Sequence, residues 1–85
     1  MAAESYDYTS VAKEVEEAVR DALPGSFVGT EPGYSGHVHL KVVSEVFRGL
    51  TEEQKQHRIW EILRDKLGSK SQCVSLALVF GPDEL

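Results

Sequence analysis

The segment from His37 to Val43 constrains the fold of this 85-residue chain more than any other. Its side chains alternate between two faces, with Val38, Leu40 and Val42 on one and His37, His39 and Lys41 on the other. Strict alternation is typical of a strand with one buried and one wet face. A second apolar run, Cys73 to Phe80, follows after a helical pattern. This spacing predicts two parallel neighbouring strands joined by a right-handed crossover.

Two amphipathic patterns predict helices. Thr9 or Ser10 is expected to cap the first, whose apolar stripe comprises Val11, Val15, Ala18, Val19 and Ala22, and Pro24-Gly25 ends it. A capping box of Thr51 and Gln54 opens the second, whose inward residues are Ile59, Ile62, Leu63 and Leu67, and Gly68 ends it.

A short strand is expected over Ser26 to Thr30, antiparallel to the strand from His37 to Val43. In the last strand, Val74, Leu76, Leu78 and Phe80 are expected to face the helices. The sequence therefore predicts an α+β, two-layer helix-on-sheet fold of order α-β-β-α-β, with a three-stranded mixed sheet. Both helices should cover the same face.

Residues 1–8 are polar and predicted to be a disordered tail, and residues 9–85 to be one domain. The single cysteine excludes an internal disulfide. No apolar run approaches the roughly 20 residues of a membrane span, and no targeting pattern opens the chain, so a cytoplasmic or nuclear location is expected. The net charge of −5 disfavours nucleic-acid binding.

Topology brings one pair of chemically active residues together. Parallel neighbours begin side by side, and His37 and Cys73 begin the two strands, so both are expected at one end of the sheet, near solvent. Two ligands are too few for a structural zinc site but suit a site that a partner completes. A nucleophilic cysteine would need a third, orienting group and a pocket, so no enzymatic activity is expected. The remaining interpretation is a packed thiol beside surface histidines.

Several motifs occur in a fixed order: Val42-Val43-Ser44, Phe47-x-Gly49, His57-Arg58, and the closing segment from Cys73 to Leu85. Together they resemble the core of the BolA family, over residues 11–85. The resemblance implies a fold related to the type II KH domain. It also implies a role as an adaptor that holds a 2Fe–2S cluster jointly with a monothiol glutaredoxin and glutathione, in iron–sulfur cluster assembly or trafficking or in iron regulation.

The resemblance also suggests ligands. Cys73 stands where the family has a histidine in the last strand, and thiolate is itself a common iron–sulfur ligand. His37 is the second expected ligand. Tyr34 is a further candidate because it lies near the family's variable ligand position, and His39 is an additional one. The free chain is expected to be a monomer without a cofactor.

The alternative function is transcription regulation through the KH-like fold. Its surface, for a partner or for nucleic acid, would include His57, Arg58, Lys55, Lys66 and Lys70. Gly33 and Gly36 spell a GxxG pattern, but here it joins two strands rather than two helices. DNA binding is therefore expected to be weak and strongly salt-dependent.

Overall fold

The computed structural model describes residues 6–85. Two helices and three strands follow one another along it: α1 (Tyr8–Ala22), β1 (Phe27–Pro32), β2 (Val38–Val43), α2 (Glu52–Leu67) and β3 (Val74–Phe80). Short 3-10 turns lie at Tyr34–Gly36, Glu45–Phe47, Gly68–Cys73 and Pro82–Glu84. The predicted element order is confirmed. Neither helix combines the length and the apolar character that crossing a membrane requires.

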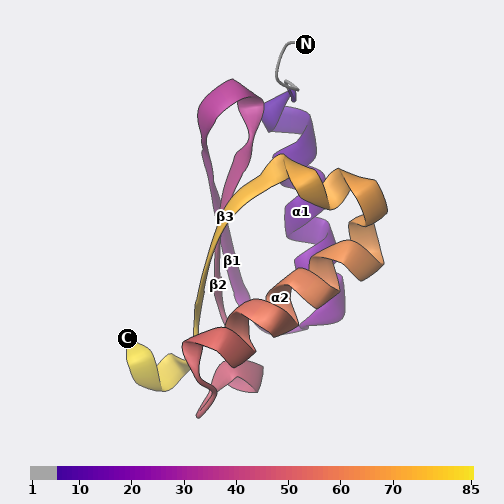
Figure 1. Cartoon of the computed structure of the whole chain (residues 1–85). Coiled ribbons are helices and arrows are strands. Elements are labelled where there is room, and N and C mark those ends of the chain that lie inside the picture. The colour runs from indigo at the N-terminus through magenta and orange to yellow at the C-terminus, as the bar shows by residue number, and fades with distance from the viewer. Residues whose placement is uncertain (1–5) are drawn as a thin grey trace.

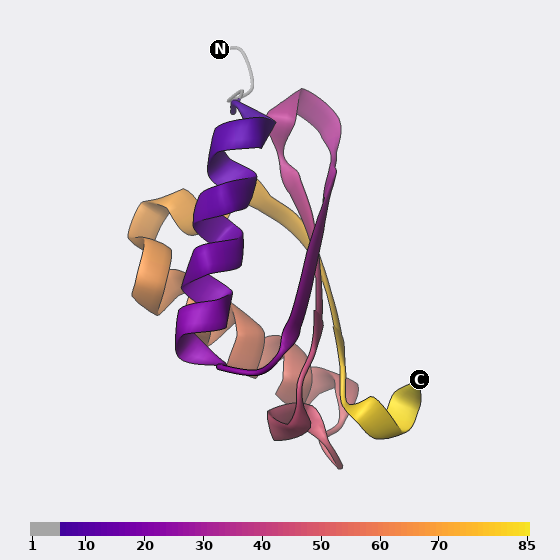
Figure 2. The ribbon, with the colours of Figure 1, turned by 180° about the vertical axis from the view of Figure 1, so that it is seen from behind.

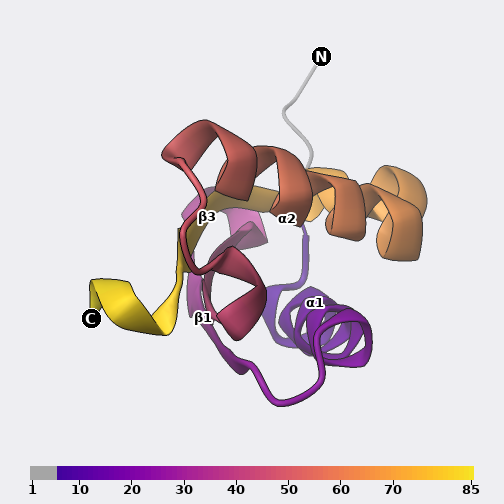
Figure 3. The same ribbon diagram turned by 90° about the horizontal axis from the view of Figure 1, so that it is seen from below.

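The three strands form one mixed sheet in the order β1-β2-β3. β1 pairs with β2 antiparallel, and β2 pairs with β3 parallel, as the crossover through α2 requires. Figures 1 and 2 show both helices on the same side of the sheet. Viewed along the strands in Figure 3, neither α1 nor α2 lies over the opposite face. The predicted two-layer α+β fold is therefore confirmed.

The core lies between the helices and the covered face of the sheet. β2 provides its centre, because Val38, Leu40 and Val42 are almost fully buried. The helices contribute a buried stripe that comprises Val15, Val19, Ile59 and Leu63. Phe47, in the turn after β2, is also fully buried and closes one end of this core. The inward faces predicted from the spacing of β2 and of both helices are confirmed.

The predicted inward face of β3 is correct at Val74 but wrong at Leu76 and Leu78. The structure buries Val74, Ala77 and Val79, whereas Leu76 and Leu78 are exposed on the uncovered face. The cause is an irregularity in the pairing with β2: Val38 pairs with Val74, but the next residue, His39, pairs with Leu76. Ser75 is thus an extra residue, and it shifts the alternation of β3 by one position.

The two helix starts differ in how well the sequence located them. Thr51 accepts from the Gln54 amide, and the Gln54 side chain accepts from the Thr51 amide, so the predicted capping box is confirmed. The first helix instead begins after Asp7, and neither Thr9 nor Ser10 caps it. The amide of Tyr6 donates to the carbonyl of Ser35 over 2.8 Å. Residues 6–8 therefore belong to the fold, and residues 1–5 of the predicted tail lie outside the described residues.

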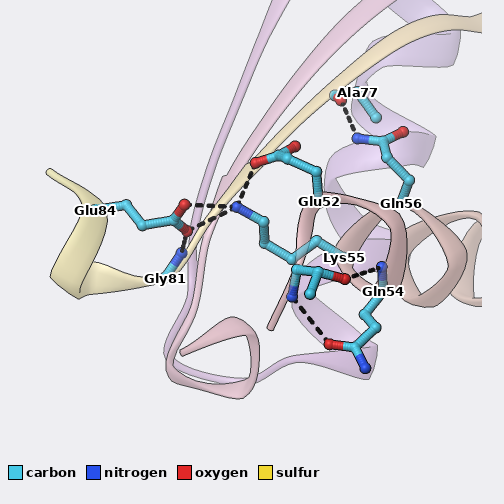
Figure 4. A network of polar contacts seen from close by, with 8 residues as sticks. Glu52, Gln54, Lys55, Gln56, Ala77, Gly81 and Glu84 are labelled. Atoms are coloured by element: carbon cyan, nitrogen blue, oxygen red, sulfur yellow. Dashed lines mark hydrogen bonds and ion pairs between the residues drawn. The ribbon is translucent and has the colours of Figure 1, made fainter. Parts of the chain in front are cut away.

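A buried lysine ties the C-terminal turn to α2. The side chain of Lys55 is only 1% exposed, and its Nζ lies 2.6 Å from Glu52 Oε1 and 2.6 Å from Glu84 Oε2. Glu84 also accepts from the amide of Gly81 over 2.7 Å. Figure 4 shows the three side chains converging. Because a buried ammonium needs carboxylate partners, this contact fixes the path of the last residues. It also removes Lys55 from the predicted partner or nucleic-acid surface.

This contact predicts a loss of stability in acid. Lys55 and then the Gly81 amide hold the pKa of Glu84 below its ordinary value of 4.5. A carboxyl whose pKa is lower in the folded state stabilises the fold above its unfolded pKa, and this stabilisation is lost as the pH falls through the folded pKa. Urea unfolding should show wild type more stable than Glu84→Gln at pH 7, with the difference gone near pH 2.

Glu17→Gln is the matched control, since Glu17 is exposed on α1 and no ion pair involves it among the described residues. Its unfolding midpoint should follow that of wild type at both pH values. An equal wild-type advantage over Glu84→Gln at pH 7 and pH 2 would contradict the assignment.

Candidate functional site

The candidate site lies at the end of the sheet where β2 and β3 begin. Because Val38 pairs with Val74, the residues just before both strands, His37 and Cys73, belong to this end, as predicted. The turn between β1 and β2 closes the same end, at the top of Figure 1. The structure thus brings the β1–β2 turn with the start of β2 and the distant start of β3 to one place.

His37 is held in one orientation and one tautomer. Its Nδ1 lies 2.8 Å from the carbonyl oxygen of Tyr34. A carbonyl only accepts, so Nδ1 carries the proton, and Nε2 of the neutral ring keeps the lone pair. The ring stacks on Tyr34, with centroids 4.3 Å apart, and meets the ring of Tyr6 edge-on at 4.9 Å. His37 is consequently almost buried, at 8% exposure.

The turn that positions His37 depends on Gly36. Ser35 and Gly36 both have positive φ, at 48° and 76°. A Cβ on Gly36 would lie 1.7 Å from the carbonyl oxygen of Tyr6, which no side chain tolerates. Because Gly36 has no side chain, the segment before α1 can cross the turn. The Tyr6 ring then packs against His37. Tyr34 itself remains 65% exposed.

Cys73 is not near solvent, which corrects the sequence-based expectation. The residue ends the 3-10 turn Gly68–Cys73 and is 1% exposed. Burial raises the pKa of its thiol, and the nearby Glu14 carboxylate raises it further, against a smaller opposing effect of Lys70. Cys73 lies in this turn, before β3 begins at Val74, so the alternation of the strand does not determine its exposure.

His39 lies on the uncovered face of the sheet, below the turn. Its imidazole lies against the backbone of Gly33, where a Cβ would be 2.7 Å from Nε2 of His39 and 3.3 Å from Oγ of Ser75. Within residues 6–85, no group of three or more His, Cys, Asp or Glu side chains is arranged to hold a metal ion. His37, His39, Tyr34 and Cys73 share an end of the sheet but do not form one ligand set.

The predicted basic surface on α2 is largely neutralised. Lys66 pairs with Asp21 over 2.6 Å, and Lys70 pairs with Glu14 over 3.1 Å. His57 and Arg58 do lie together, beside a groove of about 460 Å³ lined by Leu50, Glu53, Gln54, His57, Arg58 and Glu61. Two carboxylates, Glu53 and Glu61, line the same groove as the Arg58 guanidinium. The described residues show no concentrated positive patch here.

Sequence reasoning missed two residues of this site. Tyr6 packs against His37, and its only sequence signal is an aromatic side chain in a polar stretch. Glu14 lies on α1 and affects Cys73 through space, for which the sequence carries no signal.

No model of a known protein family matches the chain, and no curated protein matches it either. The geometry and the motifs therefore carry the functional argument.

The burial of Cys73 predicts slow alkylation. Only the thiolate of an accessible cysteine reacts with iodoacetamide, so the native thiol should react at least ~100-fold more slowly at pH 8 than the thiol unfolded in urea. Mass spectrometry of timed samples measures both rates. The matched control is Ser75→Cys in a Cys73→Ser background, because Ser75 is exposed two residues away. Its thiol should react rapidly, and an equally fast native Cys73 would contradict the burial.

Proposed function

We propose that the chain is a BolA-like adaptor. In this proposal it binds a monothiol glutaredoxin with its glutathione and shares a 2Fe–2S cluster with them, in iron–sulfur cluster assembly or trafficking or in iron regulation. The α-β-β-α-β order with both helices on one face supports it, since the resemblance implies this arrangement. The Phe-x-Gly motif of the resemblance also forms a turn here. Phe47 is buried, and Gly49 has a φ of 77°. The proposed compartment is the cytoplasm or the nucleus, and the proposed role is binding rather than catalysis.

The orientation of His37 is the observation that carries the proposal. Histidines that bind metals commonly donate their other ring N–H to a backbone carbonyl, which fixes the tautomer and makes the free nitrogen more basic. His37 does this through Nδ1 to the carbonyl of Tyr34. His37 is itself only 8% exposed, so in this proposal the exposed Tyr34 ring that stacks on it moves aside and Nε2 binds iron, while glutaredoxin and glutathione supply thiolates. A bound 2Fe–2S cluster supplies one-electron chemistry and transferable iron and sulfide.

Cys73 fits the cluster poorly in the arrangement described. A ligand thiol must be deprotonated and accessible, whereas Cys73 is buried and the pKa of its thiol is raised. Ligation by Cys73 would require the turn Gly68–Cys73 to move away from α1, to which Lys70 ties it through Glu14. We therefore propose His37 as the main ligand from this chain. Tyr34 covers the histidine from outside, and His39 lies on the other side of the turn.

The nucleic-acid alternative receives less support. Its lysines are buried or paired with carboxylates, as described above for Lys55, Lys66 and Lys70. Phosphate binding would have to break these pairs in a chain of net charge −5. The structure contains no observation that favours this function over the adaptor.

Reconstitution with a glutaredoxin tests the proposal. A monothiol glutaredoxin loaded with a 2Fe–2S cluster and glutathione is mixed with the chain, and visible circular dichroism is recorded. Wild type should convert the glutaredoxin spectrum into that of a mixed complex. His37→Phe should abolish or strongly alter this spectrum, because it keeps a ring between the two tyrosines but removes the nitrogens. Cys73→Ala should have the smaller effect.

His57→Phe is the matched control, since it removes an exposed histidine from α2, away from this end. It should give the wild-type spectrum. An unchanged glutaredoxin spectrum with wild type would overturn the adaptor proposal. An intact mixed complex with His37→Phe would overturn the ligand assignment alone.

A further inference from the structure

Neither α1 nor α2 covers one face of the sheet (Figure 3), and the side chains on this face are largely apolar. The strand pairing arranges its side chains in three rows: Phe27, Val43 and Phe80; Gly29, Lys41 and Leu78; Glu31, His39 and Leu76. Phe27, Leu76 and Leu78 are 58%, 43% and 47% exposed. Apolar side chains gathered on one face of a small domain are typical of an interaction surface.

Two opposite charges on this face lack ion-pair partners. No salt bridge within residues 6–85 includes Lys41 or Glu31. The strand neighbours of Lys41 are Gly29 and Leu78, neither of which bears a carboxylate. Its ammonium instead lies 5.7 Å from the centre of the Phe80 ring. Each charge would therefore gain from an opposite charge brought by a partner.

The face also has a hollow at Gly29, which has no side chain. Its volume is about 190 Å³, and its lining includes Phe27, Glu31, Lys41 and Leu78. Small-molecule sites usually measure about 300–1,000 Å³. The hollow is therefore suited to one inserted side chain rather than to an organic ligand. A carboxylate entering it would lie beside Lys41.

We propose that this face binds the same face of a second copy of the chain. The twofold axis lies in the plane between the two sheets and is perpendicular to the strands. It passes between the row of Lys41 and the row of His39. Leu78 then faces Leu76 of the second copy. Glu31 of the second copy enters the hollow at Gly29, beside Lys41. Because the interface is isologous, a single rotation forms both ion pairs and both leucine contacts.

The surroundings of the face favour this axis over others. The C-terminal turn Pro82–Glu84 projects on the same side as the uncovered face, at the end near Phe80 (Figures 1 and 3). A second copy centred over the uncovered face would collide with this C-terminal turn. The second copy therefore lies closer to the turn between β1 and β2. A twofold axis parallel to the strands would instead place Lys41 against Lys41 and His39 against His39. Like charges facing each other disfavour that arrangement.

A three-stranded face is smaller than the roughly 1,600 Å² of a standard interface, so we expect the dimer to be weak. The chain is then a monomer at low micromolar concentration, as the sequence analysis expects of the free chain, and pairs as the concentration rises. This inference does not depend on glutaredoxin binding or on a cluster.

Sedimentation velocity from about 5 μM to 1 mM at low salt tests the pairing by a charge swap. Wild type should show a monomer–dimer equilibrium. Glu31→Lys and Lys41→Glu should each raise the Kd about ten-fold or more, because each places two pairs of like charges at the interface. The double variant, with both changes in one chain, should restore the wild-type Kd, since the twofold then pairs lysine with glutamate again.

Glu17→Lys and Lys13→Glu are the matched controls, because they make the same charge changes at exposed positions of α1. Both should dimerise like wild type. A wild type that stays monomeric to 1 mM would overturn the proposal. So would a dimer that is insensitive to Glu31→Lys, or a double variant as weak as the single variants.

Discussion

The parallel pairing of β2 with β3 is the constraint on which the rest of the structure depends. Parallel neighbours require a crossover, and its right-handed path carries α2 to the side of the sheet that α1 already covers. One face of the sheet thereby becomes the core, and the other remains uncovered. The same pairing puts the starts of both strands at one end, where His37 lies. The candidate ligand and the uncovered face therefore have one topological origin.

A single irregularity in that pairing decides what β3 contributes. The extra residue Ser75 shifts the alternation, so Ala77 and Val79 pack under the helices while Leu76 and Leu78 turn outward. This shift makes the uncovered face apolar. One extra residue thus creates the surface proposed to pair with a second copy.

The sequence predicted those features that depend on local spacing. Alternation identified β2 and its buried side, and the Thr51–Gln54 capping box located the start of α2, because both signals lie within a few residues. The face of β3 could not be predicted, since aliphatic residues occupy both phases and only the pairing with β2 chooses between them. The burial of Lys55 was equally hidden, because it depends on Glu84, 29 residues away. The candidate site was therefore located correctly at its end of the sheet, while the exposure of Cys73 was not.

Electron–nuclear double resonance of the reduced mixed cluster tests the central claim most directly, because it detects ligand nitrogens at the iron. The chain is labelled with ¹⁵N only at histidine, combined with unlabelled cluster-loaded glutaredoxin, and reduced by one electron. The account predicts a strong ¹⁵N coupling that disappears in His37→Phe and persists in His57→Phe. A mixed cluster without any ¹⁵N coupling, or with one that survives His37→Phe, would contradict it.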